Sequence, residues 1–159
     1  MKNRTVCFTG HRNLNGENVC KIISILEDEI VKLIKDGYQY FGSGGAIGFD
    51  TIAAAETILK LKNNYPLIKL ILVLPCERQT RFWNSRDKMR YDTIKSRSDK
   101  VVYISREYNP ECMYKRNRHL VDYSSICICY LKEGKGGTAY TVHYARKNGL
   151  QIRNIANLV

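Results

Sequence analysis

The chain has 159 residues, 44% of them hydrophobic, and its 26 Lys and Arg against 15 Asp and Glu give a formal net charge of +11. This length is enough to bury the core of one domain, so we expect residues 1–159 to form a single domain. No apolar run is long enough to span a bilayer and no signal-peptide pattern precedes the first strand-like run, so the sequence excludes a membrane partner and favours the cytoplasm.

The six cysteines and three histidines offer little to a metal ion. There is no Cys-x-x-Cys pair, and the histidines are scattered. Cys7, Cys127 and Cys129 lie in apolar strand-like runs, where cysteine behaves as a small hydrophobic residue. We therefore expect neither a metal nor a cofactor.

Strand-like and helix-like segments alternate along the chain. Strands are predicted at 5–9, 38–41, 67–74, 100–105, 126–131 and 150–155, and helices from residue 15 or 16 to 37 and at 51–62, 79–97, 112–123 and 139–147. This alternation favours an α/β fold with a doubly wound, mostly parallel sheet and helices on both faces. Ligands of such sheets bind beyond the carboxyl ends of the strands. We call the loops at that edge the carboxyl rim.

The first strand is followed by Gly10, His11 and Arg12, which are therefore expected on the carboxyl rim. The Arg12 guanidinium is a fork of donors suited to phosphate, and His11 has a donor for ribose or phosphate. The alternative is a solvent-exposed turn.

A glycine-rich loop joins the second strand to the next helix. It carries Gly44, Gly45, Ala46, Gly48 and Asp50. Glycine lets a ligand approach main-chain N–H groups, and the start of a helix adds further donors, so the loop is a candidate phosphate-binding loop. Asp50 would accept hydrogen bonds from ribose hydroxyls. The alternative is a tight turn in which Asp50 merely caps or charges the helix start.

Positive charge is concentrated in residues 78–97 and 115–118, which also carry aromatic side chains. Cations that bind phosphate beside rings that stack on bases are typical of nucleotide and nucleic-acid sites. Gln79 and Trp83 are predicted to lie together on a basic helix, where Trp83 stacks on a base or else fills the core. A solvated helix face is the alternative for the whole segment.

Gly136, Gly137 and Thr138 form a second glycine loop, after the fifth strand. Because both glycine loops follow parallel strands, we expect them to share the carboxyl rim and to close on one ligand. Asp substitution of Gly45 or Gly137 should then abolish binding of the same ligand in a protein that remains folded.

Several motifs occur in an order that resembles the YpsA-like branch of the SLOG superfamily. They are Thr9-Gly10-His11-Arg12, Gly44-Gly45-Ala46-x-Gly48-x-Asp50, Leu74-Pro75-Cys76, Gln79 with Trp83, Arg116-Asn117 and Gly136-Gly137-Thr138. SLOG domains are Rossmann-like and are related to the DNA-processing protein DprA and to the LOG enzymes. The resemblance implies a nucleotide-derived ligand and, since relatives are often oligomers, a homodimer or higher homo-oligomer.

The comparison with LOG enzymes, which hydrolyse nucleoside monophosphates, succeeds only in part. By resemblance, Arg116 falls at their active-site arginine, but Thr141 stands where their catalytic glutamate is expected. Threonine cannot replace a carboxylate in glycosidic hydrolysis. We therefore expect binding in preference to catalysis, with Arg116, Glu77 and Asp122 as the remaining catalytic candidates.

Three functions follow from these patterns. The first is binding of a nucleotide-derived, phosphate-bearing small molecule, such as an ADP-ribose-like or cyclic nucleotide signal, by a sensor or sequestering protein. The alternative is a hydrolase of a nucleotide or nucleotide signal. The third is DprA-like nucleic-acid binding, suggested by the charge of +11.

Overall fold

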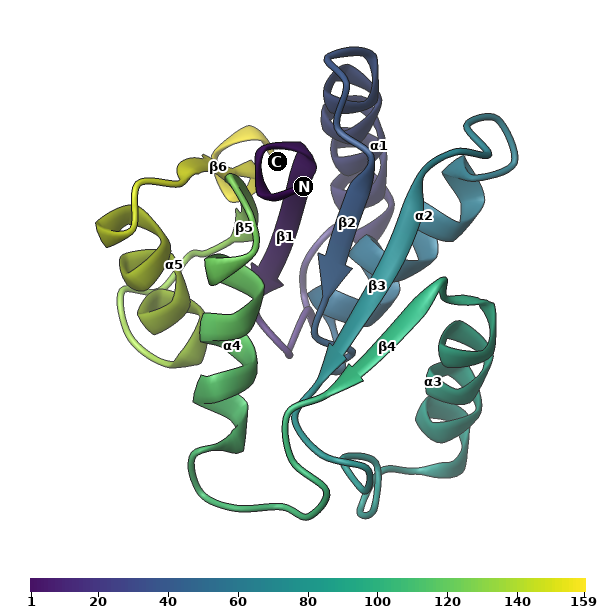
Figure 1. Cartoon of the computed structure of the whole chain (residues 1–159), viewed down its shortest axis with the longest axis vertical. Coiled ribbons are helices and arrows are strands. Elements are labelled where there is room, and N and C mark those ends of the chain that lie inside the picture. Colours follow the sequence, from purple (N-terminus) through teal and green to yellow (C-terminus); the bar gives the residue numbers. More distant parts are fainter.

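In the computed structural model, six strands form one sheet in the order β4-β3-β2-β1-β5-β6 (Figure 1). The strands are β1 (Thr5–Gly10), β2 (Tyr40–Ser43), β3 (Lys69–Leu74), β4 (Lys100–Tyr103), β5 (Ile126–Tyr130) and β6 (Gln151–Asn154). The structure describes the backbone of residues 1–159 and the side chains of residues 1–51 and 55–159. Every neighbouring pair of strands is parallel, so the predicted doubly wound, mostly parallel α/β sheet is confirmed.

Helices cover both faces of the sheet. They are α1 (Val19–Lys35), a π-helical segment (Phe49–Ala55) that continues into α2 (Glu56–Leu61), α3 (Ser85–Arg97), α4 (Cys112–Asp122) and α5 (Gly137–Lys147). α1, α2 and α3 pack on one face, and α4 and α5 pack on the other. The chain winds outward from β1 to β4 and then returns through α4 to place β5 beside β1, so the topological switch point lies between β1 and β5.

The main core lies under α1. Its buried residues Ile22, Leu26, Ile30 and Leu33 recur at helical spacing and pack with the aromatic residues of β1 and β2. The second core, under α4 and α5, contains Cys7, Cys127 and Cys129, all buried and free. The cysteines of the strands therefore act as small hydrophobic residues, as predicted.

The predicted helix 79–97 is wrong at its start, because α3 begins at Ser85. The Asn84 side chain accepts a hydrogen bond from the Asp87 N–H at 2.8 Å and so caps the helix there. Residues 79–82 form turns and Trp83 lies in a bend, which places Gln79 and Trp83 on a loop. Similarly, α1 begins three residues later than expected from Gly16, at Val19, where the Asn18 side chain accepts from the Lys21 N–H at 3.0 Å.

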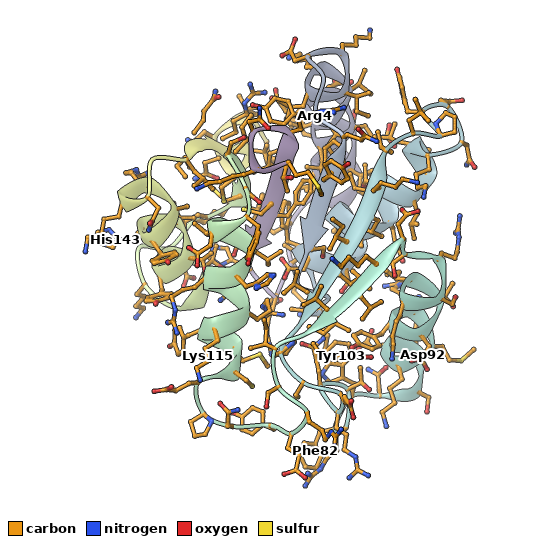
Figure 2. The ribbon with its side chains drawn as sticks, in the orientation of Figure 1. Arg4, Phe82, Asp92, Tyr103, Lys115 and His143 are labelled. Atoms are coloured by element: carbon orange, nitrogen blue, oxygen red, sulfur yellow. The ribbon has the colours of Figure 1, made fainter. Side chains whose placement is uncertain are left out.

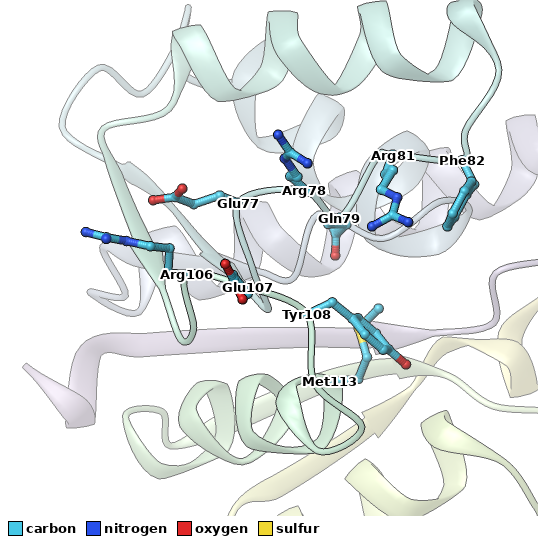
Figure 3. A pocket seen from close by; sticks show the side chains of 9 residues that line it. All are labelled: Glu77, Arg78, Gln79, Arg81, Phe82, Arg106, Glu107, Tyr108 and Met113. Carbon is cyan, nitrogen blue, oxygen red and sulfur yellow. The ribbon is translucent and has the colours of Figure 1, made fainter.

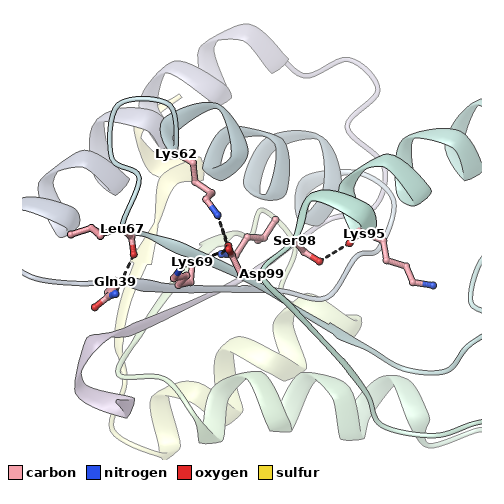
Figure 4. A network of polar contacts seen from close by, with 8 residues as sticks. Gln39, Lys62, Leu67, Lys69, Lys95, Ser98 and Asp99 are labelled. Carbon is pink, nitrogen blue, oxygen red and sulfur yellow. Dashed lines mark hydrogen bonds and ion pairs between the residues drawn. The ribbon is translucent and has the colours of Figure 1, made fainter.

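Polar contacts hold the amino ends of the strands together (Figure 4). Asp99 accepts from the Lys62 ammonium at 2.6 Å and from the Leu70 N–H at 2.8 Å. Burial acts to raise the pKa of Asp99, but the bonds to Lys62 and Leu70 outweigh it and lower that pKa. The Asp99 contacts with Lys62 and Leu70 fix α2 and β4 to β3. This edge of the sheet therefore has a structural role.

None of the helices among the described residues is long and apolar enough to cross a membrane.

Candidate functional site

A cleft of about 960 Å³ opens beyond the carboxyl ends of β3 and β4 (Figure 3). It is lined by Glu77, Arg78, Gln79, Arg81, Phe82, Arg106, Glu107, Tyr108 and Met113. One wall is the loop after β3 and the other is the loop after β4. Backbone bonds join the walls at their base, from the Ser105 N–H to the Pro75 carbonyl at 3.1 Å and from the Glu77 N–H to the Arg106 carbonyl at 3.3 Å. The loops that follow β3 and β4 thus form the two walls of one cleft.

The charged side chains of the cleft are unpaired. Arg78, Arg81 and Arg106 bring three positive charges, and Glu77 and Glu107 bring two negative ones. None of the ion pairs between described side chains includes any of these five residues. The cleft therefore carries a net positive charge whose guanidinium groups remain available to an anion.

Two aromatic rings stand in the cleft beside these charges. Phe82 is 86% exposed and Tyr108 is 65% exposed, which is unusual for large apolar rings. The Arg81 guanidinium lies over the Phe82 ring, 4.6 Å from its centre. Phe82 stands at the edge of the molecule where the strands end (Figure 2). The rings offer flat surfaces on which a planar ligand can stack.

The inner end of the cleft touches the glycine loop after β2. The Gln79 side chain donates from Nε2 to the Gly45 carbonyl at 3.1 Å, and its Oε1 is buried without a partner among the described groups. Met113 Sδ accepts from Arg116 Nη2 at 3.7 Å. Gln79 and Met113 therefore connect the open cleft to the buried residues below it.

Arg116 projects from α4 into the interior and is only 4% exposed. Its Nη1 donates to the Gly44 carbonyl, and its Nε donates to Asn117 Oδ1 at 2.7 Å. A Cβ on Gly44 would lie 2.7 Å from Arg116 Nη1. Burial lowers the pKa of Arg116, while the Asp50 charge opposes that change. The glycine at position 44 thus makes room for a buried arginine.

Asp50 is the other buried charge beneath the rim, at 7% exposure. Burial raises its pKa to about 6, against the lowering effect of Arg116 and Arg12. Its Oδ1 has no hydrogen-bond partner among the described groups. Asp50 does lie in the first turn of a helical segment, as expected if it only caps or charges the helix start. That role does not require the burial of Asp50 near the charges of Arg116 and Arg12.

Residues 10–12 join neighbouring loops together. A Cβ on Gly10 would overlap the Phe49 ring, and one on Gly48 would overlap the Arg12 backbone. His11 Nε2 accepts from the Lys132 N–H at 2.9 Å, which ties the end of β1 to the end of β5. Of these residues, Arg12 keeps an exposed side chain for a ligand.

Side chains bridge the switch point between β1 and β5. Glu17 accepts from the Tyr130 hydroxyl at 2.7 Å and from the Lys132 ammonium at 2.7 Å. The Lys132 bond lowers the pKa of Glu17 most, and the Tyr130 bond adds to it. The position where the topology predicts a ligand is thus crossed by the protein's own contacts, and the cleft lies instead at β3 and β4.

The two glycine loops differ in their surroundings. Gly45 has a φ of +68°, and a Cβ there would lie 2.7 Å from Leu74 Cδ2. Gly136 and Gly137 are exposed, with no heavy atom within 4 Å of an added Cβ. Ala46, like Gly45, is buried. Gly45→Asp would therefore disturb the packing itself, so the expectation that this variant stays folded is unsound.

The start of α5 holds the remaining residues of the second loop. Thr138 is buried, and the Thr141 hydroxyl donates to the Gly137 carbonyl at 2.9 Å. Thr141 thus closes the first turn of the helix. β1 separates β2 from β5 in the sheet, so the two glycine loops share a rim without being neighbours.

The other predicted residues are divided between the rim, the core and the far edge. Trp83 is half-buried and packs edge-on against Tyr91, with 5.4 Å between the two ring centres, which favours the interpretation of Trp83 as a core residue.

Asp122 ends α4 near the amino end of β5 and accepts from the Tyr144 hydroxyl at 2.7 Å, so the structure does not bring it to the rim. Glu77 lines the cleft. The described side chains include no group of three or more metal-ligating residues.

The sequence interpretation missed Arg106, Glu107 and Tyr108, the whole second wall of the cleft. They follow β4, and every strand of a parallel sheet places its following loop on the same rim. Extending that rule from strands one, two, three and five to strand four would have found them.

Comparisons of sequence place the chain beside bacterial proteins of one family. The family model described as the YspA SLOG family matches residues 6–157. The chain is 29% identical over 140 residues to UPF0398 protein BH1768 of Halalkalibacterium halodurans, covering 86% of this chain and 74% of that protein. It is 28% identical over 132 residues to a UPF0398 protein of Bacillus cereus, covering 81% and 71%.

Comparisons of structure find the same fold in larger proteins. DNA processing protein A of Helicobacter pylori, studied for its single-stranded DNA binding mode, matches with a TM-score of 0.66 at 19% identity. The match covers 95% of this chain and 64% of that one, less than two thirds of its length. DprA of Streptococcus pneumoniae matches with a TM-score of 0.68 at 19% identity, covering 95% of this chain and 50% of that one.

Proposed function

Because the chain belongs to the YpsA branch of the SLOG family, we propose that it binds a nucleotide-derived, phosphate-bearing small molecule and acts as a sensor or sequestering protein. The observation that carries this proposal is the cleft at β3 and β4, where three unpaired arginines stand beside two exposed aromatic rings. ADP-ribose-like and cyclic nucleotides have both the phosphates and the bases that such a site would recognise.

The division of labour within the cleft follows from its side chains. Arg78, Arg81 and Arg106 would bind phosphate oxygens through their planar forks of donors. Phe82 and Tyr108 would stack on the base. The cleft volume of about 960 Å³ lies in the range of about 300–1,000 Å³ that small-molecule sites occupy.

The other rim residues would act around this cleft. Gly44, Gly45 and Ala46 would shape its inner end by making room for Arg116 and Gln79. Gly136, Gly137 and Thr138, which lie at the open start of α5, would contact a ligand long enough to cross the rim. Arg12, whose side chain is exposed and whose charge lowers the pKa of Asp50, would add a phosphate contact.

We propose binding without turnover, because the carboxylate expected for LOG-type hydrolysis is absent. Thr141 stands in its place, and the Thr141 hydroxyl donates a hydrogen bond to the Gly137 carbonyl. Incubation of ADP-ribose, ADP and cyclic AMP with a large amount of protein should leave each nucleotide intact by chromatography. Release of free base that Glu77→Gln abolishes would instead establish a hydrolase.

Thermal denaturation with the same nucleotides tests the proposed binding. A ligand at about 100 times its Kd stabilises the folded state by about 2.7 kcal/mol, which gives a clear rise in Tm. The double variant Arg81→Gln/Arg106→Gln should lose this rise. Arg97→Gln, which removes an exposed charge of α3 outside the cleft, should keep it. If no nucleotide raises the Tm of the unmodified chain, the proposal is wrong.

Single-stranded nucleic acid is the second candidate, and the exposure of Phe82 beside Arg81 favours it. The likeness to a DprA studied for single-stranded DNA binding and the net charge of +11 agree with it. Affinity for an oligonucleotide should then fall steeply with salt, with a log–log slope of about −0.7 per phosphate contacted. A shallow slope, together with tighter binding of a mononucleotide, would favour the small molecule.

A further inference from the structure

A second hollow, of about 330 Å³, lies on the surface where α4 packs against α5. It is lined by Glu111, Tyr114, Arg118 and Tyr140, and we call it the tyrosine groove. The proposed contacts of the cleft use none of these residues. Tyr114 directly follows Met113, which lines the cleft, so the first turn of α4 carries a lining residue of each hollow.

The tyrosine groove lies on the carboxyl rim, like the cleft. The helices of this sheet run against the strands, so α4 and α5 both begin at the end to which the strand arrows point (Figure 1). Tyr114 is in the first turn of α4, and Tyr140 is in the first turn of α5. A ligand that extends from the cleft across the start of α4 therefore reaches the groove.

Two exposed rings form the walls of the groove. Tyr114 is 45% exposed and Tyr140 is 36% exposed, and their rings meet edge to face, with 4.8 Å between the ring centres. The Arg118 guanidinium donates from Nη1 to the Tyr140 hydroxyl at 2.9 Å, which links the Tyr140 ring to α4. The groove thus offers a planar ligand one ring face and one ring edge in a fixed arrangement.

The charge of the groove differs from that of the cleft. Arg118 and Glu111 contribute one positive and one negative charge, whereas the cleft has three arginines and two glutamates. A phosphate gains little from a groove without net charge. A nucleobase suits it better, because its ring stacks on tyrosine and its amino group donates to a carboxylate such as that of Glu111.

We propose that the tyrosine groove is a second base-binding site and that the ligand is a dinucleotide, two nucleosides joined through phosphates. This inference rests on the proposed nucleotide binding in the cleft. One base stacks on Phe82 and Tyr108 while the phosphates lie against the arginines of the cleft. The second base enters the groove beside Tyr114 and Tyr140.

A ligand that fills both hollows binds more tightly than one that fills the cleft alone. Once the first base and the phosphates are bound, entry of the second base is intramolecular. Stacking of a base on an aromatic side chain is strong enough to tighten binding about tenfold. A mononucleotide with the same number of phosphates leaves the groove empty and lacks this gain.

Isothermal titration calorimetry of the full chain tests the second base site. Adenosine tetraphosphate and diadenosine tetraphosphate have the same number of phosphates and differ in the second adenosine. The Kd of the dinucleotide should be about tenfold lower. Tyr114→Ala and Tyr140→Ala should each remove this difference without changing the Kd of adenosine tetraphosphate. Tyr123→Ala, which removes a 63% exposed ring beyond the other end of α4, should keep the difference.

The possible failures are distinct. Equal Kd values for the two ligands in the unmodified chain would overturn the second base site and leave nucleotide binding in the cleft. Equal loss of both ligands in the two tyrosine variants would overturn it as well, because the groove would then only support the cleft. Tighter binding of a single-stranded oligonucleotide than of the dinucleotide, with a steep dependence on salt, would replace the dinucleotide by nucleic acid. Binding of no nucleotide would overturn the proposed function and the dinucleotide together.

Discussion

Asp50 is a single carboxyl group that the fold buries within reach of the charges of Arg116 and Arg12 without completing its hydrogen bonds. Removing a carboxylate from water costs free energy, and the protein recovers part of it through the charges of Arg116 and Arg12. The part of this free-energy cost that the arginines do not offset raises the pKa of Asp50 to about 6, from an ordinary value of 3.8. A group that titrates close to neutral pH beneath the carboxyl rim makes the stability of the protein depend on pH.

Asp50→Asn should remove a specific part of the pH dependence of stability. Between about pH 4 and pH 6, folded Asp50 keeps a proton that the unfolded chain has lost, so its contribution to stability falls as pH rises through this window. The shift corresponds to about 3 kcal/mol between pH 4 and pH 7. Urea denaturation at several pH values measures the difference between the two proteins. Parallel pH profiles would show that Asp50 is charged and solvated in the folded state.

Gly45 is a position where the backbone requires glycine. Its φ of +68° is unfavourable for other residues, and a Cβ would lie 2.7 Å from Leu74 Cδ2. Gly45→Ala should therefore lower the free energy of unfolding by about 1–3 kcal/mol. Gly137→Ala, which meets no heavy atom within 4 Å, should change it by less than about 0.5 kcal/mol. Equal effects of the two variants in urea denaturation would contradict this packing.

At the scale of elements, α4 connects the rim to the core. It begins at the cleft, carries Arg116 to the Gly44 carbonyl and ends near the amino end of β5. Gln79 makes a second connection, from the loop after β3 to the Gly45 carbonyl. The glycine loop after β2 is thus held by the buried Arg116 and by Gln79, which lines the cleft, so ligand binding in the cleft and order in that loop should be coupled.

Arg116→Ala should be strongly destabilising. It leaves the buried Asp50 without the positive charge of Arg116, which opposes the rise in its pKa, and the Gly44 carbonyl without its donor. Loss of a large buried side chain together with a charge-assisted hydrogen bond to a buried carbonyl costs about 2–5 kcal/mol. Lys115→Ala, on the same helix, loses an exposed pair with Glu111 at 3.9 Å and should cost less than about 1 kcal/mol. Similar midpoints for both variants in urea would mean that Arg116 is a surface residue.

The sequence predicted which helices and strands form more accurately than it predicted where each one begins. The alternation of strands and helices predicted the sheet correctly, because buried parallel strands and amphipathic helices leave clear apolar patterns. The start of α3 was wrong because residues 79–84 contain no glycine or proline to mark a break, while the Asn84 cap is a single side-chain contact. The π-helical start at Phe49 carries no signal that distinguishes it from an ordinary helix turn.

At the scale of the whole molecule, the sequence predicted the family and the rim, but it did not show which part of the rim holds the cleft. The ordered motifs indicated the SLOG family, which the family match confirms. Carboxyl-rim residues were identified because parallel topology places them there. The sequence did not show that Glu17, Tyr130 and Lys132 cross the switch point, because those contacts join residues more than a hundred positions apart. The cleft lies at β3 and β4, away from that switch point.

Nuclear magnetic resonance with uniformly ¹⁵N-labelled protein is the most direct test of the cleft as the binding site. On titration with ADP-ribose, the amides of the non-proline residues in 77–82 and 106–113 should shift and reach saturation together. Residues 37–39 and 64–68 line a smaller cavity of about 370 Å³ at the amino ends of the strands, and the amides of their non-proline residues should stay unchanged. Shifts confined to that cavity, or no saturable shifts at all, would contradict nucleotide binding in the cleft.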